Sequence, residues 1–260
     1  MVEGLSILVL SCDNYSDLWD TFFDCFERFW PDCPYNIYLG SNTVSYNRKH
    51  IEVLYSGPDK DWSSTAKSII AQVPTKYLWV FLEDIFITSR IHNSQISNIV
   101  NFMGKTKAKH VHEKPLPKPD RYTKTGFGVY QKGAPYRVNV RGFWEKSFLL
   151  YQLIEGESPW NFEIMGSYRS SYYDGFYCLT SPICQVLNGV EKGYLHPTAV
   201  KWCRNNGIHS IDRLTRAGLT YHRRVISSLK QMYFNLVVKL VPWRLRVGIM
   251  GVLRKLLVSY

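Results

Sequence analysis

The segment at 77–82 (YLWVFL) constrains the fold more than any other, because it is apolar throughout and runs directly into Glu83 and Asp84. A short, continuous apolar run predicts a parallel strand that is covered on both faces. Open α/β sheets bind their ligands beyond the carboxyl ends of such strands. Two carboxylates at that place can hold a metal–phosphate, a sugar hydroxyl or a catalytic proton, and a strand end capped by solvated acids is the plainer alternative.

The first third of the chain alternates strand and helix patterns. The segments at 5–10, 35–39 and 51–55, rich in aliphatic residues and tyrosine, predict three further strands. Between 18 and 29 apolar residues recur at steps of three and four, which predicts a helix with Ser16 as its N-cap and Pro31 as its end. A second helix is expected over 65–72. This order predicts a Rossmann-type, mostly parallel sheet flanked by helices.

The second half of the chain is less regular. Residues 112–124 are rich in Pro and Lys, so we expect a loop or crossover there. A strand is expected at 136–140 and a helix at 143–154. The length of 260 residues suffices for one large α/β domain or two small ones.

The cysteines and the N-terminus predict the compartment. The six cysteines form no CxxC pair and no zinc-ligand spacing. The first apolar run is too short for a secretory signal peptide and has no basic flank. We therefore expect reduced thiols in a cytoplasmic protein.

The positive charge is concentrated at the end of the chain. The formal net charge is +11, and the stretch after Asp212 holds ten basic residues and no acidic one. The apolar run at 236–243 is interrupted by Lys239 and Pro242, so it cannot supply the roughly 20 residues that span a bilayer. We expect residues 1–224 to form the α/β domain and residues 225–260 to form a basic amphipathic helical segment on an anionic membrane surface. A helix packed on the sheet is the alternative.

Three segments together resemble the GT-A fold glycosyltransferases, in particular bacterial enzymes of cell-surface polysaccharide synthesis (O-antigen, capsule, lipopolysaccharide). They are 7–19 (ILVLSCDNYSDLW), 79–87 (WVFLEDIFI) and 158–167 (SPWNFEIMGS), and with their spacing they cover about residues 5–200. The resemblance implies a GT-A-like fold, a nucleotide-sugar donor and a glycan acceptor. Together with the basic tail it implies a lipid-linked acceptor at the inner face of the cytoplasmic membrane.

The resemblance also assigns donor binding to two stretches. Asp13 would accept a hydrogen bond from the base or ribose and Tyr15 would stack, although an Asx-turn or helix cap also explains Asp13. The stretch just before the acidic strand, with Ser64, would contact the donor, and a helix start is the plainer interpretation. The donor-binding residues expected are Ser11, Asp13, Tyr15, Trp62, Lys67, Glu83 and Asp84.

Glu83 and Asp84 occupy the place of the family's DxD motif, which bridges a divalent cation to the diphosphate. The chain departs from that motif because Ile85, two positions after Glu83, cannot bind metal. Asp84 alone would ligate Mg²⁺ or Mn²⁺, which take further ligands from water and phosphate. A metal-independent mechanism, in which basic side chains neutralise the diphosphate, is the alternative. The looser candidates are His196 for metal or phosphate, with a surface histidine as the alternative, and Lys192 and Arg213 for phosphate.

Glu163 is the expected catalytic base, acting with Asp84. Sugar transfer with inversion needs a carboxylate that removes the proton of the acceptor hydroxyl. Trp160 and Phe162 would form a platform for the acceptor sugar and raise the basicity of Glu163 by desolvation. Alternatively, both aromatics belong to the core and Glu163 caps a turn. Further candidates for acceptor or diphosphate binding are Arg141, Tyr168 and Arg169.

Two other function classes compete with sugar transfer. A nucleic-acid-binding protein would also be basic and rich in aromatics, but here the tail's bases alternate with apolar residues rather than with Gly and polar ones, so no nucleic acid is expected. A non-catalytic accessory protein that binds a nucleotide-sugar would share the donor site. Donor hydrolysis or transfer separates it from an enzyme.

Overall fold

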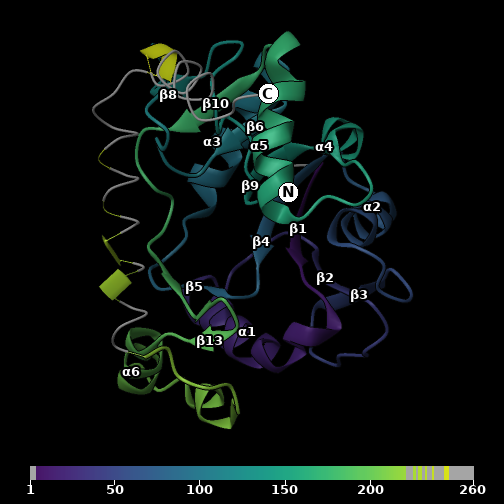
Figure 1. The fold of residues 1–260 in the computed structure, drawn as a ribbon, viewed down its shortest axis with the longest axis vertical. Coiled ribbons are helices and arrows are strands. Elements are labelled where there is room, and N and C mark those ends of the chain that lie inside the picture. The colour runs from purple at the N-terminus through teal and green to yellow at the C-terminus, as the bar shows by residue number, and fades with distance from the viewer. Residues whose placement is uncertain are drawn as a thin grey trace, which may run out of the picture.

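The computed structural model describes residues 4–220 together with 225, 226, 228, 229, 232, 236 and 243–245. These residues form a mixed α/β fold around a nine-stranded sheet, in the order β3-β2-β1-β4-β9-β6-β10-β8-β7 (Figure 1). The strands are β1 (Leu5–Leu10), β2 (Ile37–Ser41), β3 (Ile51–Tyr55), β4 (Tyr77–Leu82), β5 (Ile85–Ile87), β6 (His110–His112), β7 (Arg121–Tyr122), β8 (Phe127–Val129), β9 (Gly142–Glu145), β10 (Phe176–Leu179), β11 (Val186–Asn188), β12 (Val190–Glu191) and β13 (Tyr194–Leu195).

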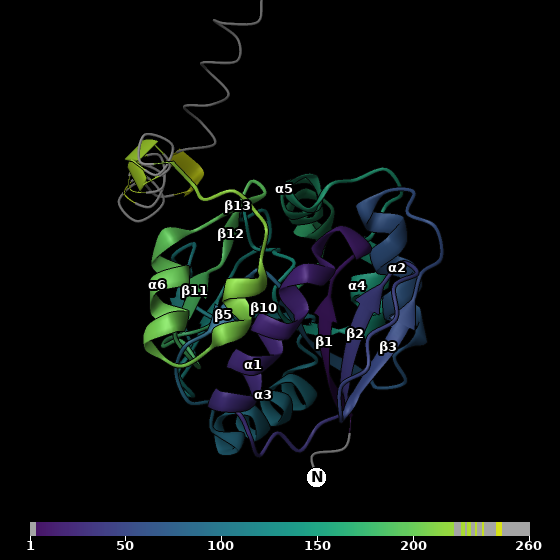
Figure 2. The same ribbon diagram turned by 90° about the horizontal axis from the view of Figure 1, so that it is seen from below.

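Helices cover both faces of the sheet, and Figure 2 sets α1 and α3 apart from α2 and α4. One hydrophobic cluster joins the sheet to α1, α3 and α6, and a second joins it to α2, α4 and α5. The helices are η1 (Asp13–Leu18), α1 (Trp19–Phe29), α2 (Trp62–Gln72), α3 (Asn93–Thr106), α4 (Lys146–Gln152), α5 (Pro159–Arg169), η2 (Ser170–Tyr172), α6 (Pro197–Asn205) and η3 (His209–Arg213), where η marks a 3₁₀-helix.

Strand β4 is apolar throughout because it contributes to both clusters. Trp79 and Phe81 pack in the cluster with α1, whereas Leu78 and Val80 pack in the cluster with α2. All four side chains are fully buried. Burial of each such side chain contributes about 1.5–3 kcal/mol to folding. The continuous apolar run thus reflects a strand with no solvent face, as the sequence predicts.

The sheet is parallel only in the half built from the N-terminal strands. β1 is parallel to β2 and β4, and β2 is parallel to β3. β9 then runs antiparallel to both of its neighbours, β4 and β6. β10 is parallel to β6 but antiparallel to β8, and β8 is antiparallel to β7. The prediction of a mostly parallel sheet is therefore confirmed for β3-β2-β1-β4, and the remainder is mixed.

Several predicted element boundaries are wrong. Helix α1 begins at Trp19 rather than after Ser16, because the 3₁₀-helix η1 precedes it. Helix α2 begins three residues earlier than predicted, since Asp61 caps it by accepting a hydrogen bond from the Ser64 amide. Strand β2 forms at Ile37–Ser41, two residues after its predicted start.

The predictions at 136–140 and 143–154 are also wrong. Residues 136–140 form no strand, because Tyr136 has a φ of +58° and the amide of Val138 bonds to a side chain, that of Ser167, instead of to a neighbouring strand. Residues 142–145 form β9, so only Lys146–Gln152 of the predicted helix is helical. Between 112 and 124 the expected loop is present, and the short strands β6 and β7 lie at its two ends.

Most of the predicted membrane segment, 225–260, lies outside the described residues, so the structure does not test it. Two described tail residues contact the domain: the Trp243 indole donates to Asp120 Oδ1 at 2.8 Å, and Arg244 donates to Gln131 Oε1 at 2.7 Å. Among the described residues no helix has the length and apolarity needed to cross a membrane.

Candidate functional site

The candidate site lies where β1, β2 and β4 end. These strands are parallel neighbours, with Val9 opposite both Leu39 and Phe81, so the residues that follow them meet at one edge of the sheet. Ser11 to Asp13 follow β1, Asn42 follows β2, and Glu83 with Asp84 follow β4. This is the edge at which open α/β sheets bind ligands.

Asp13 holds the loop that follows β2. Its carboxylate accepts hydrogen bonds from the Ser41 and Thr43 hydroxyls, at 2.8 and 2.7 Å, and from the backbone amides of residues 42–44. Burial raises the pKa of Asp13, but the hydrogen bonds from Thr43, Ser41 and Val44 outweigh it and lower the pKa overall. Asp13 therefore fixes the loop after β2 beside the end of β1, and its carboxylate is already committed to that loop.

Glu83 points into the protein and is 7% exposed. Burial, and secondarily the charge of Asp84, raise its pKa to about 8, while a hydrogen bond with Ser11 lowers it. Ser11 is itself buried and accepts a hydrogen bond from the Trp19 indole at 2.8 Å. Ser11 and Glu83 are thus both buried beneath the site, and burial favours the protonated form of Glu83.

Asp84 has more accessible surface than Glu83 and lies among charged groups. Burial raises its pKa, and the positive charges of Arg141 and Arg216 lower it. Its backbone carbonyl accepts from the Gly189 amide at 2.6 Å, and the Gly189 carbonyl accepts from the His196 amide at 2.8 Å. The structure therefore brings His196 near Asp84 through Gly189, although the His196 ring bonds to Thr198.

Arg216 reaches the site from the C-terminal part of the domain. Its guanidinium donates to both carboxylate oxygens of Asp17, at 2.7 Å each, and to the Asn14 carbonyl. It lies 4.5 Å from the centre of the Tyr15 ring. Its charge acts on Glu83 and Asp84 as well, so Arg216 covers one face of Tyr15 beside the carboxylate pair.

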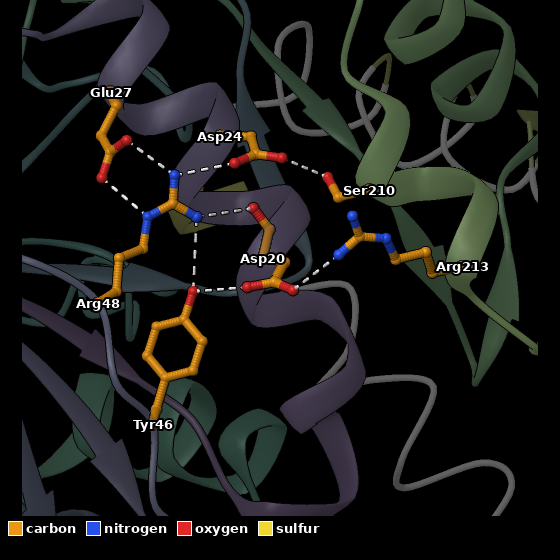
Figure 3. A network of polar contacts seen from close by, with 7 residues as sticks. All are labelled: Asp20, Asp24, Glu27, Tyr46, Arg48, Ser210 and Arg213. Carbon is orange, nitrogen blue, oxygen red and sulfur yellow. Dashed lines mark hydrogen bonds and ion pairs between the residues drawn. The ribbon is translucent and has the colours of Figure 1, made fainter.

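A polar network on α1 fixes the segment that carries Arg216 (Figure 3). Arg48 binds Glu27 through two hydrogen bonds, at 2.8 and 2.7 Å, and Asp24 at 2.8 Å. Ser210 of η3 donates to the other oxygen of Asp24 at 2.6 Å. The acidic face of α1 thus joins the loop after β2 to η3.

Arg213, at the end of η3, lies 3.7 Å from Asp20 and belongs to this network. The side chain is 78% exposed, and its predicted role as a phosphate ligand stays a prediction. Beyond η3, a backbone bridge between Gly218 and Leu195 of β13 holds the chain on the other side of Arg216. Arg216 is consequently anchored from both directions.

Arg141 approaches the site from the residue before β9. It is 8% exposed, its Nε lies 2.9 Å from Glu113 Oε2, and its guanidinium lies 5.4 Å from the centre of the Phe81 ring. Glu113 also accepts a hydrogen bond from the Trp79 indole. Arg141 was expected to bind the acceptor, which stays a prediction, and its positive charge lowers the pKa of Asp84.

Glu163 lies on α5, which begins at the Ser158 cap and at Pro159 in its first turn. Its carboxylate accepts from the Val140 amide at 3.2 Å. Burial raises the pKa of Glu163, and this hydrogen bond lowers it. Val140 precedes β9 by two residues, and Gly142 at the start of β9 lies opposite Val80 of β4. Glu163 is therefore held by the segment that leads into β9.

The two predicted platform aromatics behave differently. Trp160 is 72% exposed, whereas Phe162 is fully buried and packs against Trp62 and Trp144. The expectation that Phe162 contacts a sugar is corrected, because the i+2 spacing on a helix directs the two side chains to different faces. Lys67 is exposed on α2.

The remaining sequence candidates lie at the periphery. Tyr168 is 66% exposed. Arg169 forms two hydrogen bonds with Glu157, at 2.6 and 2.8 Å. Lys192 is exposed in the turn between β12 and β13, with a φ of +51°.

A resident metal ion would find few protein ligands here. Across the described part of the chain, no group of three or more His, Cys, Asp or Glu side chains is placed to hold one. Asp84 is the accessible member of the carboxylate pair. An ion at this site would therefore need to take most of its ligands from a bound diphosphate and water.

Sequence reasoning missed Arg216, Glu113 and Asn42 as members of the site. Arg216 was counted only as part of the basic tail, and Glu113 stands in a stretch expected to be a loop. The side chain of Asn42 accepts from the Asp13 amide at 3.0 Å, which ties the first two strand ends together. The turn-forming residues 40–42 (GSN), which follow the predicted strand at 35–39, were the one hint to Asn42.

No protein-family model and no curated protein sequence matches the chain. Several solved structures resemble it in fold. Staphylococcus aureus TarS shares 9% identity over 79% of this chain and 39% of its own length, with a TM-score of 0.48. A UDP-glucose pyrophosphorylase in complex with UDP-glucose shares 7% identity over 82% of this chain and 98% of its own, with a TM-score of 0.45.

The galactosyltransferase LgtC, in complex with donor and acceptor sugar analogs, shares 8% identity over 76% of this chain and 78% of its own, with a TM-score of 0.37. This chain spans about two fifths of the length of TarS. At these values the likeness concerns the arrangement of strands and helices, and the functional conclusion has to come from the site.

Proposed function

We propose that this chain is a glycosyltransferase that moves a sugar from a nucleotide-sugar donor to a glycan acceptor. The observation that carries the proposal is the carboxylate pair Glu83–Asp84 at the end of β4, which Arg141 and Arg216 approach from two different elements. The Tyr15 ring lies against the Arg216 guanidinium. This edge of the sheet therefore offers one ligand an aromatic ring, hydrogen-bond donors and a carboxylate. A nucleotide-sugar presents a base, phosphates and hydroxyls that match these groups.

The charge balance of the site favours a divalent cation for the diphosphate. Arg216 is paired with Asp17 and Arg141 with Glu113. Burial favours the neutral form of Glu83, and the more accessible Asp84 is the carboxylate of the pair that we propose carries the charge. A bound diphosphate would add further negative charge, so we propose that Mg²⁺ or Mn²⁺ at Asp84 balances it, rather than the arginines alone. When bound, such an ion would stabilise the charge that develops on the leaving diphosphate.

Glu163 is the proposed base. Its pKa is raised by burial, which makes the carboxylate a stronger proton acceptor, and the Val140 amide in the segment before β9 holds it. The exposed Trp160 ring on the same helix offers a surface for the acceptor sugar. We expect this acceptor to approach from the α5 side of the site.

The direct test of the proposed function is a titration of the full chain with UDP, GDP and their common sugar conjugates, with and without Mn²⁺. Ligands that bind the native state raise the melting temperature by mass action. We expect a rise with at least one nucleotide and its sugar, and slow release of free sugar from the conjugate. The absence of any shift would overturn the proposal, and binding without hydrolysis or transfer would indicate an accessory binding protein.

We further propose that the acceptor is lipid-linked and belongs to cell-surface polysaccharide synthesis at the inner face of the cytoplasmic membrane. The described tail residues Ile226, Leu229, Met232 and Leu236 are 53–63% exposed and recur at steps of three and four. Such spacing places them along one face of a helix, which would present an apolar stripe to lipid. Nearby basic residues would each add about 1 kcal/mol on an anionic surface.

Removal of residues 225–260 should abolish binding to anionic vesicles and lower the transfer rate to a lipid-linked acceptor, while nucleotide-sugar binding is kept. The truncation also removes the hydrogen bond between Trp243 and Asp120, so we expect a loss of about 1–2 kcal/mol in stability. Vesicle sedimentation at low and high salt, with neutral vesicles as the control, measures the first effect. A truncated chain that aggregates or no longer binds donor would show that the tail belongs to the core.

A further inference from the structure

The carboxylate of Asp61 accepts more hydrogen bonds than a helix cap requires. As the N-cap of α2 it accepts from the Ser64 amide at 2.9 Å, which is the bond that such a residue normally provides. It also accepts from the Ser63 and Ser64 hydroxyls, at 2.6 Å each, and from the Gly156 amide at 3.0 Å. The hydrogen bonds from Ser63 and Ser64 lower the pKa of Asp61 well below its usual range, so the carboxylate stays ionised.

A second hydrogen bond joins the same two segments. The Ser63 hydroxyl is fully buried and accepts from the Glu157 amide at 3.1 Å. Gly156 has a φ of +84°, which glycine adopts without strain, and its amide turns toward α2. The Glu157 carboxylate accepts from Arg169 of α5 at 2.6 and 2.8 Å. The two bonds from the Gly156 and Glu157 amides form a bridge between the start of α2 and the segment before α5, the α2–α5 bridge.

The α2–α5 bridge ends where α5 begins. Ser158, the N-cap of α5, is the next residue in the chain. Beside the bridge, the Trp62 ring of α2 packs against the Phe162 ring of α5, with ring centres 5.5 Å apart. Glu163 follows Phe162, and its carboxylate accepts from the Val140 amide at 3.2 Å. The position of Glu163 therefore depends on two supports, the segment before β9 and the start of α2.

We infer that Asp61 is a positioning residue, which fixes the start of α5 through the α2–α5 bridge and thereby the place of the Glu163 carboxylate. The inference rests on the proposed function, in which Glu163 takes the proton of the acceptor hydroxyl. A general base acts only within hydrogen-bond reach of the proton that it removes, so a displacement of about 1 Å would lower the rate. Asp61 acts through the backbone of residues 156–157, so its effect should appear in kcat more than in donor affinity.

Three variants separate the bridge from the helix cap. Asparagine caps helices about as well as aspartate, so α2 should stay folded in Asp61→Asn. Its neutral amide oxygen is a weaker acceptor than the ionised carboxylate, which serves four donors, so the bridge should loosen. Ser63→Ala removes the second bond and keeps Asp61. Asp59→Asn is the matched control, because Asp59 lies in the same loop but accepts from the Thr65 hydroxyl of α2 at 3.0 Å.

Amide hydrogen exchange on the full chain measures the bridge without any substrate. The Gly156 amide should exchange about 5-fold faster or more in Asp61→Asn than in wild type, as for the loss of one hydrogen bond, and the Glu157 amide should do so in Ser63→Ala. Both amides should exchange at the wild-type rate in the Asp59→Asn control.

The pKa of Glu163 measures its position, also without substrate. In protein labelled with ¹³C-glutamate, the Glu163 carboxyl signal is assigned by its absence in Glu163→Gln and followed by NMR as a function of pH. Burial is the larger and the Val140 amide the smaller influence on this pKa. A loosened α5 exposes the carboxylate to water, so the pKa should fall in Asp61→Asn and in Ser63→Ala and stay unchanged in Asp59→Asn.

The rate provides the third measurement. UDP-glucose, UDP-galactose, UDP-GlcNAc and GDP-mannose are tested as donors with Mn²⁺. With the donor that the wild-type chain uses, Asp61→Asn should lower kcat about 10- to 100-fold and change KM much less, because the base is present but displaced.

Two results would overturn the inference. Wild-type exchange of both amides in Asp61→Asn and Ser63→Ala would show that the bridge does not hold the start of α5. Faster exchange with an unchanged pKa of Glu163 would leave the bridge without any effect on this carboxylate. A wild-type chain that binds and cleaves none of the donors would instead refute the proposed function, while the exchange and NMR measurements still decide whether Asp61 positions Glu163.

Discussion

Replacement of Asp84 by alanine should abolish measurable sugar transfer and leave the fold intact. The side chain follows β4 at the ligand-binding edge and packs in neither hydrophobic cluster, while its backbone is held by Gly189. Loss of a preorganised electrostatic partner typically costs about 10²–10³-fold in rate, and loss of a cation as well would deepen the defect. Initial rates of transfer, or of donor hydrolysis, with saturating Mn²⁺ provide the measurement.

Asp84→Asn is the shape-matched variant, and it should fail nearly as badly because the amide is neutral. Asp174→Ala is the control, since Asp174 is 86% exposed and pairs with Lys132 at the surface. EDTA should reproduce the Asp84 defect in wild-type protein if the cation is required. Full turnover by Asp84→Ala would remove this carboxylate from the mechanism, and full activity in EDTA would return the mechanism to the metal-independent alternative.

Fold prediction from the sequence succeeded where one physical signal dominates. Strands β1, β3 and β4 have the predicted bounds. β1 and β4 are buried along almost their whole length, whereas β3 is only partly buried and includes the exposed Glu52. It failed around 136–145, where long-range contacts override local pattern. The side chain of Arg137 is fully buried and donates to the carbonyls of Gln131, Ser170 and Tyr173, which no window around residue 137 reveals.

The residues of the candidate site also fall into those that the sequence could predict and those that it could not. Glu83 and Asp84 could be found because they follow directly from a recognisable strand. Arg216 forms a hydrogen bond with Asp17, which lies near the other end of the domain's sequence. Glu113 accepts a hydrogen bond from Trp79, but Glu113 itself lies in a stretch whose composition predicts a loop. The helix α5 was overlooked although Ser158 and Pro159 form a start signal, because its apolar positions give no strong periodic pattern. Residues that assemble a site across such separations carry no local signature.

Glu163→Gln should lower the transfer rate by about 10²–10⁴-fold, the usual contribution of a general base, with little change in donor affinity. Glutamine keeps the size of the side chain and can still accept from the Val140 amide. In the wild-type protein, kcat/KM should fall as the pH drops through the raised pKa of Glu163, because the protonated acid cannot take a proton. In the variant, the residual kcat/KM should no longer show this fall at low pH.

Stability distinguishes a catalytic Glu163 from a structural one. Burial raises the pKa of the Glu163 carboxyl in the folded protein above its value in the unfolded chain. The stability that the protonated side chain contributes is therefore complete below the unfolded pKa and is lost as the pH rises through the folded pKa. The neutral glutamine avoids this loss, and Glu163→Gln should melt no lower than wild type at pH 8. Glu155→Gln, an exposed substitution just before α5, is the control. Normal turnover by Glu163→Gln, combined with unfolding of Glu163→Ala, would make the residue structural, and the base would have to be another group at the end of β4.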